Sequence, residues 1–157
     1  MKLGVIYRGM KVSASDLDAG KRTLALIFSS ADLVRQAFGN EVLSHAAGAV
    51  DLSRLAAGAP MVWNQDVNEL IGVVESAYIG NDQRGHAKVR FSRSDIGKAM
   101  MQDVEDRIIR WASVGYRIKS MTRTVENVKN PDFTVTRWQP ILISLVSVPP
   151  DSTPELG

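Results

Sequence analysis

The chain has 157 residues, of which 45% are hydrophobic and 23% are charged, a composition typical of one soluble globular domain. Nineteen Lys and Arg residues against seventeen Asp and Glu leave a net charge of +2, which gives no reason to expect nucleic acid as a partner. The absence of cysteine excludes disulfides, thiolate metal sites and a cysteine nucleophile. No apolar run is long enough for a signal peptide or a membrane span, so we expect a cytoplasmic domain with no membrane partner.

The N-terminal third is predicted to contain two strands and two short helices. Residues 3–8 and 22–28 have the apolar, β-favouring composition of strands, and a polar, turn-rich stretch separates them. Ser30 is placed to cap a helix that runs to Phe38, before Gly39. A second helix is expected over residues 51–57, "DLSRLAA", ahead of a glycine and a proline.

The central part of the chain indicates a hairpin followed by the clearest helix. Two apolar runs, 70–79 and 86–91, flank the turn-forming loop "GNDQRG". From about Asp95 to Arg110 apolar residues then recur every four positions, after a serine and an aspartate at capping-box spacing. The expected buried stripe of this helix is Ile96, Met100, Val104 and Ile108.

The C-terminal part favours strands. Residues 112–121 alternate well enough for one strand, and residues 133–138 and 141–148 are expected to form two more, broken at Pro140. About eight strands and three helices, not strictly alternating, favour an α+β fold with a mostly antiparallel β-barrel flanked by helices. We predict one domain over residues 1–150, followed by a flexible tail over 151–157 that has no core-forming residues.

Few residues are candidates for catalysis. The two histidines, His45 and His86, are each expected to have a structural or surface role. No histidines or carboxylates have the spacing of metal ligands and no phosphate-binding loop is present, so neither a metal nor a cofactor is expected. Ser113 lies where a helix gives way to a strand, a junction that can present a hydroxyl to a cleft near backbone N–H groups. By itself this is a weak signal.

Three segments together are more informative. They are "PMVWNQDVNELIGVVESA", "RFSRSDIGKAMMQDVEDRIIRWASVGYRI" and "TRWQPILISLVSVPPD". In order and spacing they resemble the prohead serine proteases of tailed phages, whose segments contain Asn-His-Asp, then Ser-x-Gly-Tyr, then Trp-x-Pro-x-Glu-x-Ser-Leu-Val. The upstream stretch "EVLSHAAGAVDLSRLAAGAPM" resembles the subgroup in which the protease is fused to a major capsid protein. The resemblance covers residues 3 to 151.

The resemblance implies a fold like that of the herpesvirus maturation protease, a β-barrel surrounded by helices. It also implies a reaction, the hydrolysis of scaffolding segments of capsid proteins inside the procapsid, in the host cytoplasm. The major capsid protein and its scaffolding segment would be the partners, and a homodimer is left open. Transferred by position, Ser113 is the nucleophile, Gln65 occupies the place of the general base, and Leu142 occupies that of the orienting acid.

The sequence thus departs from the family pattern at two of three catalytic positions. A glutamine amide cannot take a proton from a serine hydroxyl near neutral pH, and leucine cannot orient an imidazole. We therefore expect this chain to be inactive as a protease. Three explanations are open: a deliberate inactivating substitution, a natural pseudoprotease used for capsid assembly or binding, and a rewired site that uses His45, His86 or Asp66. A binding module of β-barrel type with no protease ancestry is the alternative from another class.

Overall fold

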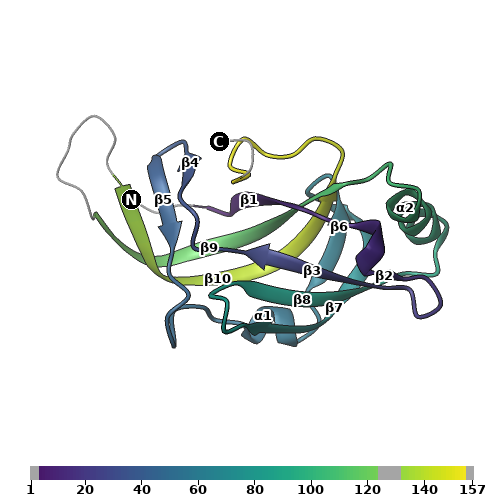
Figure 1. The fold of residues 1–157 in the computed structure, drawn as a ribbon, viewed down its shortest axis with the longest axis horizontal. Helices are drawn as coiled ribbons and strands as arrows, with labels where there is room; N and C mark the ends of the chain where they lie inside the picture. The colour runs from purple at the N-terminus through teal and green to yellow at the C-terminus, as the bar shows by residue number, and fades with distance from the viewer. Residues whose placement is uncertain (1–3, 124–131, 155–157) are drawn as a thin grey trace.

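The computed structural model describes residues 4–123 and 132–154 and consists mostly of β-sheet (Figure 1). Two α-helices and one 3₁₀ helix occur in these residues. In chain order the elements are β1 (Ile6–Lys11), η1 (Ala14–Asp16), β2 (Leu17–Asp18), β3 (Thr23–Ser29), β4 (Val34–Gln36), β5 (Gly39–Leu43), α1 (Ser53–Ala56), β6 (Pro60–Trp63), β7 (Asp66–Ile79), β8 (Gly85–Phe91), α2 (Asp95–Glu105), β9 (Trp111–Arg123) and β10 (Asp132–Val146).

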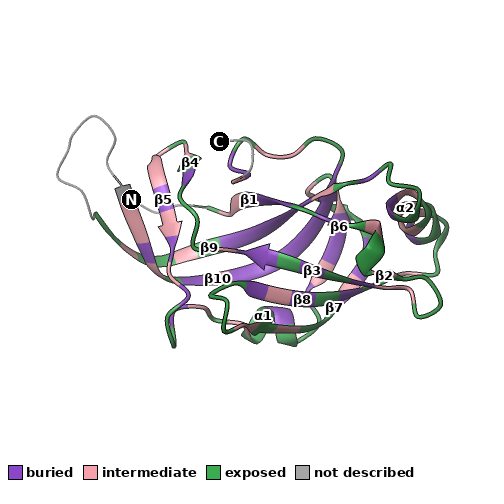
Figure 2. Ribbon diagram, viewed as in Figure 1, coloured by how far each residue is buried: buried purple, intermediate pink, exposed green. Residues whose placement is uncertain are grey.

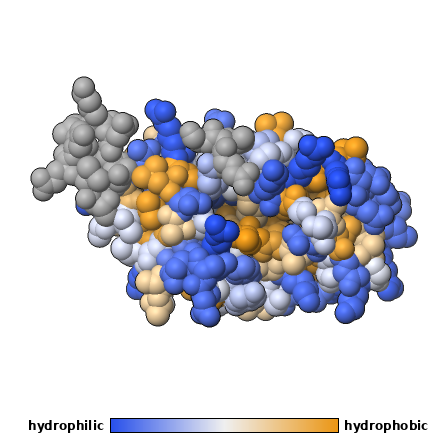
Figure 3. Space-filling model, in the orientation of Figure 1, coloured by the Kyte–Doolittle hydropathy of each residue, from blue (hydrophilic) through white to orange (hydrophobic). Residues whose placement is uncertain are grey.

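All the strands belong to one sheet with the order β1-β9-β10-β6-β7-β8-β3-β2, and β5 joins β10 while β4 joins β5. The strand pairs are antiparallel except for β10 with β5 and β10 with β6, which are parallel. The sheet curls until β1, at one edge, comes into contact with β3, which lies next to the short edge strand β2, so that it forms a half-barrel (Figure 1). A hollow of about 180 Å³ remains along this seam, where apolar side chains stay visible from outside (Figure 3).

Residues that alternate along the strands fill the inside of the half-barrel. Trp138 lies at the centre, fully buried, with Phe28, His45 and Tyr116 in edge contact with its ring. Its indole N–H donates to the Ser44 carbonyl at 2.9 Å, which satisfies its one polar atom. Figure 2 shows that β9 and β10 are buried along much of their length.

β9 is buried on both faces for part of its length, which ordinary strand alternation does not produce. Ala112, Val114 and Tyr116 point into the main core. Ser113 and Gly115 therefore point to the outer face. A second apolar cluster covers that face, made of Val62, Ile141 and Leu142 with Val5 and Tyr7 packed against it.

The helix predicted over residues 30–38 is wrong. Ser30 accepts the backbone N–H of Asp32 in a local turn, and β4 pairs with β5 in a hairpin with Gln36 opposite Gly39. β5 then continues the sheet alongside the start of β10. Because that pairing joins segments about ninety residues apart, local propensity carries no signal of it.

The predicted helix of 95–110 is confirmed in its first eleven residues and wrong in its last five. Its N-cap is Ser94, which accepts the N–H of Gly97 at 3.2 Å, and not Ser92 of the predicted capping box. The helix ends at Glu105, and Arg107 adopts a left-handed φ of 63° that turns the chain. Ile108 is consequently 71% exposed. The core position that was predicted for Ile108 is taken by Ile109, which is 5% exposed.

The remaining elements follow the predictions more closely. The hairpin of residues 70–79 and 86–91 is present as β7 and β8, and the second short helix is present as α1. Pro140 does not end a strand: β10 runs through it, with a register shift between Pro140 and Leu142. Since proline has no N–H for the ladder, an irregularity there is expected.

Candidate functional site

A tight turn between β6 and β7 carries Gln65. Trp63 pairs with Asp66, and the two residues between them, Asn64 and Gln65, have φ values of 50° and 60°. Positive φ at both central positions is typical of a type I′ hairpin turn, which asparagine adopts readily and glutamine does not. Holding a non-glycine side chain there costs about 1–3 kcal/mol, so the surroundings must hold the turn in place.

Three hydrogen bonds to β10 and to the residue after it fix this turn. The Asn64 N–H donates to the Leu145 carbonyl at 2.8 Å, and the Asn64 side-chain oxygen accepts the N–H of Ser147 at 3.0 Å. The N–H of Gln65 donates to the hydroxyl of Ser144 at 2.7 Å. These hydrogen bonds therefore fix the backbone of Gln65, and with it the position from which the Gln65 side chain extends.

Ser113 lies on β9 with Gly9 of β1 on one side and Ser144 of β10 on the other. Its side chain is fully buried, and the Gln65 amide nitrogen donates to its hydroxyl at 3.3 Å. The structure thus brings together residues 65 and 113, as the family order predicts. The expected open cleft is absent at Ser113, because the hydroxyl has no exposed surface.

Leu142 is not part of this contact. It lies opposite Gly115, two residues along β9 from Ser113, and packs over that glycine beside Tyr7. Its surroundings are apolar and it is only 5% exposed. The polar group that touches the turn from β10 is Ser144 instead, a residue that the sequence analysis did not single out. The period of two along a strand could have found it, because Ser144 faces the same side as Leu142.

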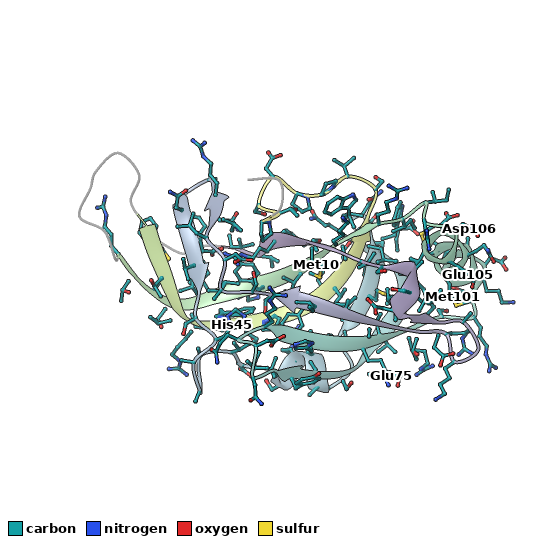
Figure 4. The ribbon with its side chains drawn as sticks, in the orientation of Figure 1. Met10, His45, Glu75, Met101, Glu105 and Asp106 are labelled. Carbon is teal, nitrogen blue, oxygen red and sulfur yellow. The ribbon has the colours of Figure 1, made fainter. Side chains whose placement is uncertain are left out.

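Neither histidine reaches Ser113. His45 is buried against Trp138, and its Nδ1–H donates to the Leu43 carbonyl at 2.9 Å while Nε2 accepts from the Ser29 hydroxyl at 2.8 Å. In Figure 4 it lies toward the end of the molecule opposite α2, whereas β9 begins beside α2. Burial lowers the pKa of His45.

The other two candidates for a rewired site also have partners elsewhere. His86 Nε2 is 2.9 Å from an Asp82 carboxylate oxygen, and its ring stacks on Tyr78. The carboxylate of Asp66 accepts the N–H of Asn68 within its own turn. No geometry supports recruitment of any of the three as a base for Ser113.

A buried polar network lies behind the site, on the inner side of β1 and β9. The Tyr116 hydroxyl donates to Glu41 at 2.6 Å, and Arg8 donates to the Glu41 and Ser30 carbonyls. Burial lowers the pKa of Arg8, an effect that the Glu41 carboxylate opposes, and burial raises the pKa of Tyr116. This network ties β5 to the strands that carry Gly9 and Ser113.

Other kinds of site are not supported by the described residues. Within residues 4–123 and 132–154, no three His, Asp or Glu side chains are close enough together to hold a metal ion. The two α-helices in those ranges are each too short to cross a membrane.

The profile of the caudovirus prohead serine proteases matches residues 10–155. The chain belongs to this family. It is also 42% identical over 127 residues to the major capsid protein of Halomonas phage phiHAP-1, a match that covers 79% of this chain and 21% of the capsid protein. The chain thus spans about a fifth of the length of that relative.

Among solved structures, the bacteriophage T4 capsid assembly protease gp21 has a similar fold, with a TM-score of 0.61. The match covers 90% of this chain and 96% of gp21 at 10% sequence identity, so it supports the fold alone. The half-barrel is therefore a fold that this prohead protease family member shares with a phage capsid protease.

Proposed function

We propose that this chain is a capsid-maturation endopeptidase domain of a tailed phage in which the hydrolytic step is disabled. The observation that carries the proposal is the contact between Gln65 and Ser113. A serine nucleophile needs a proton acceptor at that position, and the structure has an amide N–H donating to the hydroxyl.

The chemistry of the amide leads to the same result in either orientation. If the side chain is turned so that its oxygen faces Ser113, that oxygen can accept a hydrogen bond but cannot hold the proton. Leu142 supplies no carboxylate in either case. Serine proteases that lack a triad member keep about 10³–10⁴-fold catalysis over water, far too little for capsid maturation.

The similarity to a major capsid protein supports a place inside the procapsid, in the host cytoplasm. The ancestral substrate would be the scaffolding segment of the capsid protein, and a homodimer stays open. No cofactor is required by this chemistry. A barrel like that of the herpesvirus maturation protease stays part of the proposal, as does the domain boundary at residue 150.

A natural pseudoprotease that serves capsid assembly is the second candidate. It is favoured by the surroundings of Leu142, which packs with Val62, Ile141 and Tyr7 in an apolar cluster suited to leucine. A single inactivating change at position 65 would leave that cluster unexplained. A site adapted around both residues accounts for the two departures together.

The experiment restores the base. The chain, its Gln65→His variant and the Gln65→His/Leu142→Glu variant are each incubated with the phage capsid protein, and cleavage is followed by mass spectrometry. We expect no cleavage by the chain itself, cleavage by at least one restored variant, and none when Ser113→Ala is added. Labelling of Ser113 in the unaltered chain by a fluorophosphonate would contradict the proposal, because it would require another activating group.

A further inference from the structure

The segment that follows β10 returns across the outer face of β1. Ser152 and Thr153 are 6% and 1% exposed, although neither is a typical core residue. The Ser152 hydroxyl donates to the Tyr7 carbonyl at 2.7 Å, and the Thr153 hydroxyl donates to the Pro150 carbonyl at 2.6 Å. We call residues 147–154 the covering segment. Whether the chain from residue 151 is flexible stays a prediction, but its described part lies against β1.

Gly9 is the point at which this segment approaches most closely. A Cβ atom on Gly9 would overlap the Thr153 hydroxyl and would lie 2.9 Å from Cδ of Pro150. Because Gly9 lies opposite Ser113 in the antiparallel ladder, a Cβ there would point to the same face as the Ser113 side chain. Thr153 and Pro150 therefore lie over β1 on the face to which the Ser113 side chain points.

Two other groups enclose Ser113. Gln65 covers it from the side of Ser144, and Tyr7 and Leu142 fill the space over Gly115. The result is that no surface of Ser113 is accessible. A reacting carbonyl must approach a nucleophile to about 3–3.5 Å, so no peptide can meet Ser113 while the covering segment is in place.

The covering segment has few contacts that would make it permanent. Its buried residues are a serine and a threonine, and its largest aliphatic side chain, Val148, is 74% exposed. Segments with little buried apolar area open at a small fraction of the global unfolding free energy. A hollow of about 500 Å³ also continues along it, lined by Tyr7, Gln65, Val148, Pro150 and Ser152.

We propose that the outer face of β1 is a binding groove for an extended peptide with small side chains, and that residues 147–154 of the chain itself occupy this groove and cover Ser113. Gly9 is the residue that determines which side chains fit, because its missing side chain makes the space that Thr153 fills. The biological meaning of the groove rests on the proposed function, in which Ser113 is the reactive position. The existence of the groove does not depend on the proposed function.

The absence of cysteine allows a direct test, since Ser113→Cys introduces the only thiol of the chain. The rate at which 5,5′-dithiobis(2-nitrobenzoate) modifies this thiol reports how often position 113 opens. Gly9→Ala in the Ser113→Cys background forces the covering segment away from β1. Gly4→Ala is the matched control, because a Cβ on Gly4 meets no atom within 4 Å.

We expect Gly9→Ala to raise the rate at least about tenfold, and Gly4→Ala to leave it unchanged. Ser152→Ala/Thr153→Ala, which leaves β1 untouched, should also raise the rate and serves if Gly9→Ala does not fold. A peptide with the sequence of residues 147–154 should slow labelling of that double variant.

Equal labelling rates for the parent and for a folded Gly9→Ala or Ser152→Ala/Thr153→Ala variant would overturn the proposal. So would failure of the peptide to protect the thiol at millimolar concentration. Thiol labelling needs no hydrolytic activity, so this result is independent of whether Gln65→His restores cleavage. Failure of the groove and failure of the proposed function can therefore be told apart.

Discussion

Two adjacent isoleucines between α2 and β9 offer a test of how Ser113 is positioned. Ile109 is 5% exposed and belongs to the main core, whereas Ile108 is 71% exposed. Ile109 lies four residues before Ser113, and the neighbouring Arg110 carbonyl accepts the N–H of Val12 at 2.8 Å. A loss of packing at Ile109 therefore reaches the start of β9 directly.

The structure sets the size of the effect. Truncating a buried isoleucine to alanine typically costs about 2–5 kcal/mol, because it loses both the transfer free energy and the packing around the cavity. For a domain of this length each kcal/mol lowers Tm by about 2–4 °C, so Ile109→Ala should lower Tm by roughly 4–20 °C. Ile108→Ala removes a side chain that is mostly in water and should change the unfolding free energy by less than about 0.5 kcal/mol.

Urea unfolding followed by tryptophan fluorescence measures both variants under the same conditions. The same chemical change at neighbouring positions makes each variant the control for the other. Equal losses of stability, or a larger loss for Ile108→Ala, would refute the placement of the helix end at Glu105. It would also remove the argument that Ile109 holds the β9 strand in place.

Two further predictions concern buried charge and pH. Glu41→Gln should cost about 3–5 kcal/mol of unfolding free energy, because it leaves the Arg8 guanidinium buried without its carboxylate. Glu75→Gln in the exposed pair with Arg90 is the control and should cost under about 1 kcal/mol. Similar losses for the two variants in chemical denaturation would show that the buried pair is not maintained. Burial lowers the pKa of His45, so the unfolded chain binds the proton more readily and stability should fall as the pH drops below about 6.5. His45→Gln should reduce this dependence of Tm on pH and His86→Gln should leave it in place, and an unchanged pH profile in His45→Gln would contradict the assignment.

The sequence by itself determined the elements whose signals are local. Apolar, β-favouring runs indicated β3 and the β7–β8 hairpin, and a turn-rich loop marked where that hairpin reverses. The start of α2 at Asp95 was predicted correctly, although the serine that caps it is Ser94 and not Ser92. The family, and the contact between Gln65 and Ser113, could also be predicted, because the order of three sequence segments matches that of the family.

Only the tertiary structure decided which residues surround Ser113. The pairing of β5 with β10, the contact of Ser144 with the Gln65 turn and the covering segment over Gly9 each join segments tens of residues apart. Ile109 is buried in place of Ile108 because Arg107 adopts a left-handed φ, and the spacing of apolar residues does not indicate such a turn. Propensity and periodicity act over a few residues, whereas the burial of a hydroxyl depends on every strand that passes over it. The accessibility of the nucleophile position is for that reason a property of the folded half-barrel and not of any motif.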